Sequence, residues 1–457
     1  MSLASLALRA KADDRVTIEI RPVAGPDGDR NVMWVELGGE TASGFRGVPL
    51  SSSTSAMVEH AAKVARHEGL PLVVVLASTG ADIVEGIAAL EGWGRLAKAL
   101  VDCSGVVPTI MVVDGPAVSG PALLLGVADL VVMTQASYAF VNGPVMVAEF
   151  TGVQISTNEL GGPHELARHT GVPSVVVADR DAATEAVLEL LGYLPSSADE
   201  EPPRWPNDDP VDRLCPEAGA LIPPTSTGSY DVRQVAGAIV DEASLMEIRE
   251  RFAPNVVTAF ATVDGRPIGI VANQPNALAG TLDIPASQKA ARFVAFCDAF
   301  NIGLLTLVDT PGFYPGKDLE WRGMIRHGAQ LVFAYARATV PRLCVILRKS
   351  YGGAYIVMDS KRMGNDGCFA WPWAELAVMG AGQAAAILQR RASPEERNAF
   401  EADYRERLLN PYIAAERGYI DAVIDPANTR VEIAAAFENL ADKRERLQPR
   451  KHGNEPL

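Results

Sequence analysis

Two adjacent glycines and an alanine form the first stretch of the chain whose residue types could do chemistry. An apolar run, Val340–Leu347, leads to Gly352-Gly353-Ala354, and Tyr355 and Ile356 then begin a predicted helix. Adjacent glycines let a ligand approach the backbone closely, and the first N–H groups of a helix have no intrahelical acceptor. Donors fixed in this way stabilise negative charge on a carbonyl oxygen. The stretch is therefore a candidate oxyanion hole, although a tight turn without chemistry could have the same sequence.

The same arrangement occurs a second time in the first half of the chain. A shift of 233 positions places Val107–Val113 on Val340–Ile346. The same shift places Gly120 on Gly353. An internal repeat of this length predicts one fold that is built twice. Ser119 and Gly120 then form a second candidate oxyanion turn, equivalent to the first.

The hydrophobic pattern predicts an α/β protein with parallel sheets. Continuous apolar runs of strand length alternate with helical periods in both halves, which is the rhythm of βα units covered by helices. Two hairpins precede these units, one in each half. The expected strands are 70–76, 107–113, 129–133, 256–263, 268–272, 304–308 and 340–347, and the expected helices are 54–68, 84–101, 286–300 and 321–338.

Length and local composition predict two domains. The 457 residues are too many for one ordinary core. Residues 195–216 are acidic and rich in proline, which is linker composition. We therefore expect an N-terminal domain at 1–205, a linker at 206–225 and a C-terminal domain at 226–457.

Composition also excludes several classes of partner. The formal net charge of −15 argues against nucleic acid and anionic membranes as partners. The five cysteines are scattered without a Cys-x-x-Cys pair, and the histidines lack metal-ligand spacing, so neither a disulfide framework nor a metal site is expected. The sequence predicts no signal peptide and contains no apolar run long enough to span a bilayer. We expect a cytoplasmic protein.

Two other enzymatic chemistries have partial signals. The stretch Gly312–Asp318 is one residue short of a phosphate-binding loop and ends in aspartate, so a nucleotide hydrolase is rejected. The segment Gly115–Leu125 resembles the nucleophile segment of Clp-type serine peptidases, with Ser119 at the nucleophile. A serine nucleophile needs a neighbouring base. Asn142 stands in the neighbourhood where that family has its histidine, and we expect Ser119 to contribute its backbone N–H instead.

A set of motifs in the second half resembles the carboxyltransferase (β) subunit of biotin-dependent acyl-CoA carboxylases, of the propionyl-/acetyl-CoA carboxylase type. This family belongs to the crotonase superfamily, and the resemblance is close after about residue 230 and more distant before it. The resemblance implies duplicated crotonase-like (ClpP/crotonase) ββα spiral domains. The matching stretches are Val271–Pro275, Ala279–Ile284, Lys289–Val294, Phe296–Ile302, Val308–Gly316, Arg326–Ala329, Tyr335–Pro341, Arg348–Tyr355, Ala370–Gly380 and Asn410–Asp421.

The resemblance implies that the second half binds biotin. The N–H groups of Gly353 and Ala354 would hold the ureido oxygen of biotin, with Gly352 and Tyr355 beside it. Carboxybiotin arrives on a separate carrier, releases CO2 and removes the α-proton of the acyl group, whose enolate then takes up the CO2. No metal is implied on this chain.

The first half would bind the acyl-CoA. Ser119 and Gly120 would hold the thioester oxygen through their N–H groups, and Gly80 and Ala81 would contact the substrate. Ile356 stands where the family lines the acyl pocket, and an apolar residue there suits a short aliphatic acyl chain.

The family also implies partners. The chain has no Met-Lys-Met biotinyl motif and no ATP-grasp portion, so a separate biotin carboxylase and biotin carrier (α) subunit is expected. The active site would lie between two protomers, which requires at least a dimer and suggests a hexamer.

Departures from the family pattern fall in the first half. The family's Asp-Ser-Gly-Gly-Ala-Arg is here Ala77–Asp82, its Phe-Gly-Gly-Ser-Leu-Gly is Phe45–Leu50, and Ser119 replaces the first glycine of the oxyanion pair. These changes leave the acyl acceptor open, including a thioester on a carrier protein. Two alternatives also stay open: a biotin-dependent decarboxylase or transcarboxylase subunit, and a carboxylase-like scaffold without catalysis.

Overall fold

The chain consists of two compact units. The computed structural model describes residues 13–26, 28–41, 44–449 and 451–456. The first unit is Met1–Pro203 with Ala299–Asn301, and the second is Arg204–Asp298 with Ile302–Leu457. The residues on which the expectation of no signal peptide depends, 1–12, lie outside the described part.

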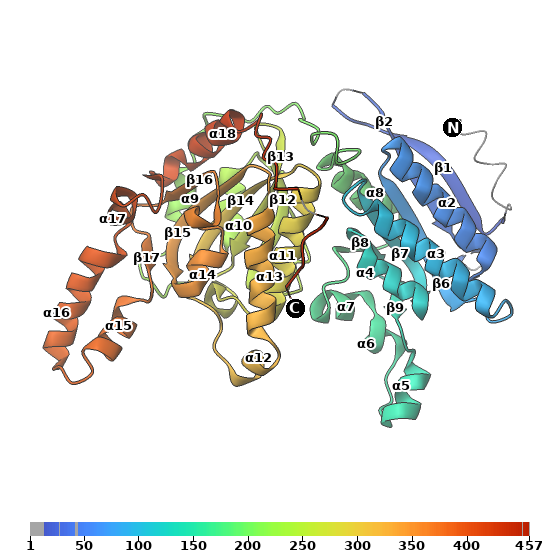
Figure 1. The fold of residues 1–457 in the computed structure, drawn as a ribbon, viewed down its shortest axis with the longest axis horizontal. Helices are drawn as coiled ribbons and strands as arrows, with labels where there is room; N and C mark the ends of the chain where they lie inside the picture. The colour runs from blue at the N-terminus through green and yellow to red at the C-terminus, as the bar shows by residue number, and fades with distance from the viewer. Residues whose placement is uncertain (1–12, 27, 42–43, 450, 457) are drawn as a thin grey trace. The chain divides into compact units, whose positions relative to one another are not determined.

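The first unit is built on one sheet of eight strands (Figure 1). An antiparallel pair at one edge is followed by parallel strands in the order β1-β2-β6-β7-β8-β10, while β5 pairs with β6 and β9 pairs with β7. The strands are β1 Val16–Val23, β2 Arg30–Leu37, β5 Val48–Leu50, β6 Leu72–Ala81, β7 Thr109–Val118, β8 Leu130–Thr134, β9 Tyr138–Phe140 and β10 Val175–Val177, and β3 Gly39–Thr41 pairs with β4 Gly44–Arg46. The helices are α2 Ser52–Glu68, α3 Ile87–Cys103, η1 Gly120–Leu123, α4 Leu124–Val127, α5 Pro144–Thr151, α6 Thr157–Gly161, α7 Pro163–His169 and α8 Arg180–Gly192.

The second unit repeats this plan. Its strands run β11-β12-β13-β14-β15-β16-β18, with β17 paired to β15 as β9 is paired to β7. The strands are β11 Met246–Ile248, β12 Val256–Val263, β13 Arg266–Asn273, β14 Gly303–Thr310, β15 Arg342–Tyr351, β16 Gly367–Ala370, β17 Glu375–Ala377 and β18 Ala422–Val423. The helices are α9 Pro216–Ala220, α10 Val232–Ile239, η2 Leu278–Gly280, α11 Ile284–Ala299, α12 Lys317–Trp321, α13 Met324–Arg337, α14 Gly352–Val357, η3 Lys361–Met363, α15 Ala381–Leu388, α16 Pro394–Tyr404, η4 Arg405–Leu409, α17 Pro411–Glu416, η5 Pro426–Asn428 and α18 Thr429–Asn439.

The expected strands and helices are present because the apolar runs are buried. All five residues of β8 and all eight of β14 are buried, as expected for parallel strands covered on both faces. The helix α2 begins at a capping box, in which Ser51 Oγ accepts from Thr54 N (3.1 Å) and Thr54 Oγ1 accepts from Ser51 N (2.9 Å). Gly69 ends the helix in the left-handed region.

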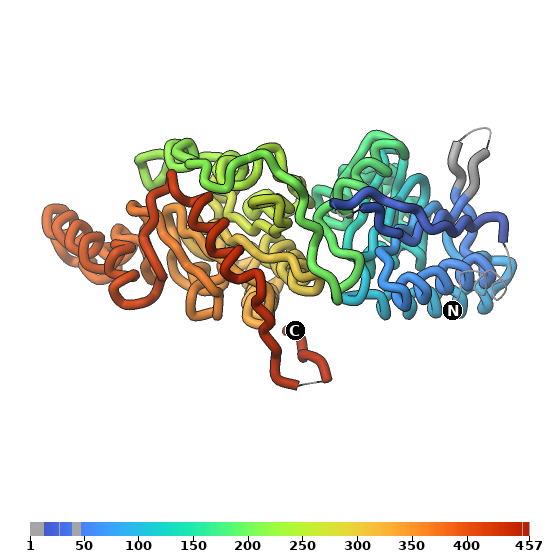
Figure 2. The backbone as a smooth tube through the Cα atoms, turned by 90° about the horizontal axis from the view of Figure 1, so that it is seen from above, coloured from blue at the N-terminus to red at the C-terminus, as the bar shows by residue number. Residues whose placement is uncertain are grey.

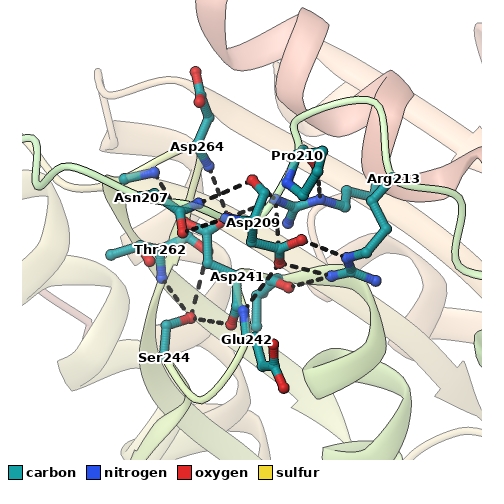
Figure 3. Close-up of polar contacts among 12 residues, drawn as sticks. Asn207, Asp209, Pro210, Arg213, Asp241, Glu242, Ser244, Thr262 and Asp264 are labelled. Atoms are coloured by element: carbon teal, nitrogen blue, oxygen red, sulfur yellow. Dashed lines mark hydrogen bonds and ion pairs between the residues drawn. The ribbon is translucent and has the colours of Figure 1, made fainter.

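Residues 206–225, expected as a linker, pack within the second unit. Arg213 Nε donates to Asp209 Oδ1 (2.6 Å), and Asp209 Oδ2 accepts from Glu242 N (3.0 Å). These contacts belong to the polar cluster in Figure 3. Cys215 and Ala218 join the apolar core of that unit. An acidic, proline-rich composition therefore does not distinguish a free linker from a segment that is held by an ion pair, hydrogen bonds and core packing.

The second unit also carries a projecting pair of helices. Figure 1 and Figure 2 both show α15 and α16 as a helical pair that projects from its sheet. Among the described residues, no helix combines the length and the apolar character that crossing a membrane requires.

Candidate active site

The turn of the second half lies directly after the strand β15. Gly352 is the first residue of α14 and has φ +62°, a value that favours glycine. Gly353 is exposed, whereas Ala354 is buried. A Cβ placed on Gly353 would lie 3.4 Å from the ring of Phe313, so the missing side chain leaves space above that ring. The turn therefore exposes backbone, and Gly353 is the accessible member of the predicted donor pair.

A buried ion pair supports this turn from behind. Arg348 Nε donates to Asp309 Oδ2 at 2.9 Å, and both side chains are almost fully buried. Tyr230 Oη donates to the same oxygen (2.8 Å), and the backbone N–H of Lys349 donates to Asp309 Oδ1 (3.2 Å). Burial beside the Asp309 carboxylate raises the pKa of Tyr230 well above its ordinary value. The end of β15 is thus fixed to the end of β14.

The same arginine holds a segment that is distant in sequence. Arg348 Nη1 donates to the carbonyl oxygens of Thr225 (3.0 Å) and Gly228 (2.9 Å), and Lys349 Nζ donates to the carbonyl of Ser226 (2.9 Å). Residues just before the glycine turn therefore bind the chain at 225–228.

A second buried ion pair joins the start of β15 to the end of α14. Arg342 Nη1 lies 2.5 Å from Asp359 Oδ1, and Arg342 Nη2 donates to the Gly364 carbonyl (2.6 Å). Asp359 has φ +56°. The ion pair thus ties together the two ends of the strand–turn–helix segment that contains Gly353.

Asp359 should make stability depend on pH. Burial raises its pKa to about 7 despite the attraction of Arg342. The unfolded value is about 3.9, so between about pH 4 and pH 7 the folded state binds more protons than the unfolded state. This group's contribution to the free energy of unfolding therefore falls as pH rises, by about 4 kcal/mol in total. Asp359→Asn should remove that decline in urea titrations.

A matched control for this prediction is Asp403→Asn. Asp403 pairs with Arg407 on the exposed side of α16, where a salt bridge contributes little. Asp403→Asn should keep the wild-type dependence of the free energy of unfolding on pH. If Asp359→Asn also showed the wild-type dependence, the raised pKa would not belong to Asp359.

The turn of the first half has the same position but different donors. Ser119 follows β7 and has φ 64° and ψ −143°. Its backbone N–H donates to the carbonyl of Phe140 (2.9 Å), at the end of the strand β9. In this structure the pairing of β7 with β9 uses the Ser119 N–H that the sequence suggested for a ligand. Gly120 keeps its N–H, and Pro121 has none.

Gly80 and Ala81 reach this turn at the end of the neighbouring strand. Gly80 has φ +111°, and a Cβ placed on it would lie 3.5 Å from Ser119 Cβ. Its N–H donates to Ser78 Oγ (3.3 Å). Ala81 is the last residue of β6 and pairs with Leu50 of β5. The structure thus brings Gly80 beside Ser119, and Ala81 follows it at the same strand end.

The residues that hold these turns have little signal in the sequence. In the sequence, Asp309 stands out only as part of the family-like stretch Val308–Gly316, and Arg348 only as the first residue of Arg348–Tyr355. Trp93, on α3, lies against Gly120, since a Cβ on that glycine would be 3.5 Å from the indole. Asp309 lies near the carboxyl end of β14, and the glycine turn follows the carboxyl end of the neighbouring parallel strand β15. Ligands of parallel sheets bind at such strand ends, so this position was the available signal for Asp309.

The residues of the two turns, Ser119–Pro121 and Gly352–Ala354, include no acidic, histidine or cysteine side chain. Among the residues that the structure describes, no group of three or more His, Cys, Asp or Glu side chains could bind a metal ion. What each turn presents is backbone and, at Ser119, a hydroxyl. Such groups stabilise an enolate or a ureido oxygen without themselves moving a proton.

Comparison with known proteins gives a family. The "Carboxyl transferase domain" family matches residues 35–455. The propionyl-CoA carboxylase beta chain of Saccharopolyspora erythraea is 45% identical over 413 residues, which cover 86% of this chain and 76% of that protein. The methylmalonyl-CoA decarboxylase subunit alpha of Veillonella parvula is 40% identical over 405 residues, covering 87% of this chain and 79% of that protein.

A solved structure shows the same fold. The crystal structure of transcarboxylase 12S, described as a hexamer assembly with hydrolysed methylmalonyl-coenzyme A bound, has a TM-score of 0.92 and 39% identity, and covers 97% of this chain and 85% of that one. The predicted crotonase-like α/β fold is thereby confirmed. The chain belongs to the carboxyl transferase family, and it is a carboxyltransferase of the kind found in biotin-dependent carboxylases and transcarboxylases.

Proposed function

We propose that this chain transfers the carboxyl group of carboxybiotin to the α-carbon of a short acyl-CoA, as the β subunit of a biotin-dependent carboxylase. The observation that supports it most is the pair of equivalent glycine turns, one after β7 and one after β15. Two oxyanion sites suit a reaction in which an enolate and a ureido oxygen both need donors. The similarity to a propionyl-CoA carboxylase beta chain supports a short acyl group.

The biotin site would be the second-half turn. Gly353 is exposed and lacks a side chain above Phe313, which fits a flat ureido ring that approaches the backbone. Gly353 and Ala354 would direct N–H groups to the ureido oxygen, and Gly352 and Tyr355 would flank it. Carboxybiotin supplies the carboxyl group and, after CO2 leaves, a basic nitrogen for the α-proton. This chain's residues orient it and stabilise the charge on its oxygen.

The acyl-CoA site would be the first-half turn. Gly120 donates its N–H to the thioester oxygen, and Gly80 and Ala81 border the substrate beside Ser119. Ile356, with 40% of its surface exposed, would come from a second copy of the chain and limit the acyl chain as an apolar wall. These roles follow from the family resemblance and from the positions of the residues at strand ends.

The partners would be a biotin carboxylase and biotin carrier (α) subunit and further copies of this chain. Large apolar side chains at Ile83, Val84 and Ile87 are more than two-thirds exposed, as expected for a surface that a second copy covers. A homo-oligomer, a hexamer by analogy with the solved transcarboxylase 12S, is proposed. The protein would be located in the cytoplasm, where acyl-CoA is available.

One assay separates this function from its alternatives. The protein is incubated with a biotinylated carrier subunit, its carboxylase, ATP, bicarbonate and a panel of acyl-CoA and acyl-carrier thioesters. ATP-dependent carboxylation of a short acyl thioester is the expected result. Loss of CO2 from malonyl-type thioesters without ATP would instead favour a decarboxylase. The similarity to the decarboxylase subunit of Veillonella parvula makes this alternative worth testing. A stable complex without either reaction would favour a scaffold.

A further inference from the structure

Ser119 has a backbone conformation that a glycine would adopt without strain. Its φ is 64° and its ψ is −143°, close to a region that is used almost only by glycine. The equivalent residue of the second half, Gly352, has φ +62° and is a glycine. A side chain in such a conformation persists only where the surroundings compensate for it, and such residues cluster at functional sites.

The first-half turn is short of backbone donors. The N–H of Ser119 is donated to the Phe140 carbonyl (2.9 Å), and Pro121, at the position equivalent to Ala354, has no N–H. Gly120 remains as the backbone donor of this turn. An oxyanion hole generally uses two or more donors, so one further hydrogen-bond donor is expected nearby.

The Ser119 hydroxyl is in the right place to be that donor. Ser119 is exposed, and within the described part of the chain its Oγ has no hydrogen-bond partner. Its Cβ lies 3.5 Å from where a side chain on Gly80 would begin, so the absence of that side chain leaves room beside the hydroxyl. The indole of Trp93 lies against Gly120, because a Cβ on that glycine would be 3.5 Å from it.

We propose that the Ser119 hydroxyl donates a hydrogen bond to the thioester oxygen of the acyl substrate, together with the Gly120 N–H, and replaces the backbone donor that Pro121 lacks. This inference rests on the proposed carboxyl transfer to an acyl thioester. The hydroxyl keeps its proton and forms no covalent bond with the substrate, and it stabilises the negative charge that develops on the oxygen as the enolate forms.

Stability and activity should respond to Ser119→Gly in opposite directions. Removing the side chain relieves the backbone strain, so the melting temperature should rise by about 2–4 °C. The same change removes the donor, so kcat for carboxylation should fall about 10²-fold with little change in the KM for the acyl-CoA. Ser119→Ala keeps the strain and should lose the same activity without the gain in melting temperature.

A binding measurement tests the inference without turnover. A CoA thioether that carries a nitronate is a stable mimic of the enolate. Calorimetry should show that Ser119→Gly and Ser119→Ala bind this nitronate about 10²-fold more weakly, while they bind an unreactive saturated CoA thioether as wild type does. Ser104→Ala, an exposed serine at the end of α3, is the matched control and should change neither affinity.

Three results would overturn the inference. Ser119→Gly and Ser119→Ala could both retain full turnover and full nitronate affinity. Mass spectrometry could find an acyl group on Ser119, which would make it a nucleophile. Wild type could show neither transfer nor a preference for the nitronate, which would overturn the proposed function and the inference together, whereas the first two results leave the proposed function standing.

Discussion

Gly353→Val should lower the rate of carboxyl transfer by about 10²–10³-fold while the chain stays folded. In the proposed function, Gly353 offers its N–H at an exposed point where a ligand oxygen must come within hydrogen-bond distance. Its φ is not in the left-handed region, so the backbone accepts a side chain, and a Cβ there would only touch Phe313 at 3.4 Å. The added methyl groups would fill the space that the ligand needs, with the effect of losing one oxyanion donor.

Turnover with carboxylated carrier and acyl-CoA measures the effect, and thermal unfolding checks the fold. Gly237→Val is the matched control, because Gly237 lies exposed on α10 with open space around it. It should leave turnover unchanged. If Gly353→Val also turned over at the wild-type rate, the second-half turn would not be the biotin site.

Arg348→Met should lower the free energy of unfolding by about 3–5 kcal/mol, because it leaves the Asp309 carboxylate buried without its cation. Asp309 Oδ2 lies 2.9 Å from Arg348 Nη2, and the Asp309 side chain is fully buried. The substitution keeps most of the apolar volume and removes the donors to the Thr225 and Gly228 carbonyls as well. Urea titration monitored by tryptophan fluorescence gives the magnitude.

Two further variants separate the unpaired charge from general damage. Arg266→Met breaks a surface ion pair in which Arg266 Nη2 lies 2.9 Å from Glu438 Oε2. It should lower the free energy of unfolding by only about 0–1 kcal/mol. Adding Asp309→Asn to Arg348→Met removes the unpaired charge and should restore part of the lost stability. A cost below about 1 kcal/mol for Arg348→Met alone would mean that the pair does not hold the turn.

The sequence predicts the fold well where burial is continuous. The parallel strands β8 and β14 are visible as apolar runs because both of their faces are covered, and the repeat of 233 residues is visible because β7 and β15 keep the same pattern. The order of strands, β6-β7-β8 and β14-β15-β16, then follows from right-handed parallel connections.

Features that depend on long-range contacts could not be predicted. The Ser119 N–H is used by β9, a strand of three residues that is too short to give a sequence pattern. Arg348 and Asp309 are 39 positions apart, and only the alignment of β14 with β15 brings them together. The segment 206–225 is expected to be a linker, but the burial of Cys215 depends on a core formed mostly by later residues.

The candidate site divides in the same way. Gly352 and Gly353 are recognisable from their types and spacing: the positive φ of Gly352 favours glycine, and Gly353 beside it is exposed. At Ser119 the type is misleading, since the sequence suggests a backbone donor and the conformation instead leaves the side chain as the available group.

The transfer half-reaction tests the central claim most directly, because free biotin can take the place of the carrier and no biotin carboxylase is needed. Malonyl-CoA and methylmalonyl-CoA labelled in the free carboxyl group are incubated with this chain and biotin or a biotinylated carrier, without ATP. Acid-labile label on biotin, formed by wild type and lost in Gly353→Val but not in Gly237→Val, is the predicted result. Label that remains on CoA thioesters or leaves only as CO2, with no carboxybiotin formed from either substrate, would contradict it.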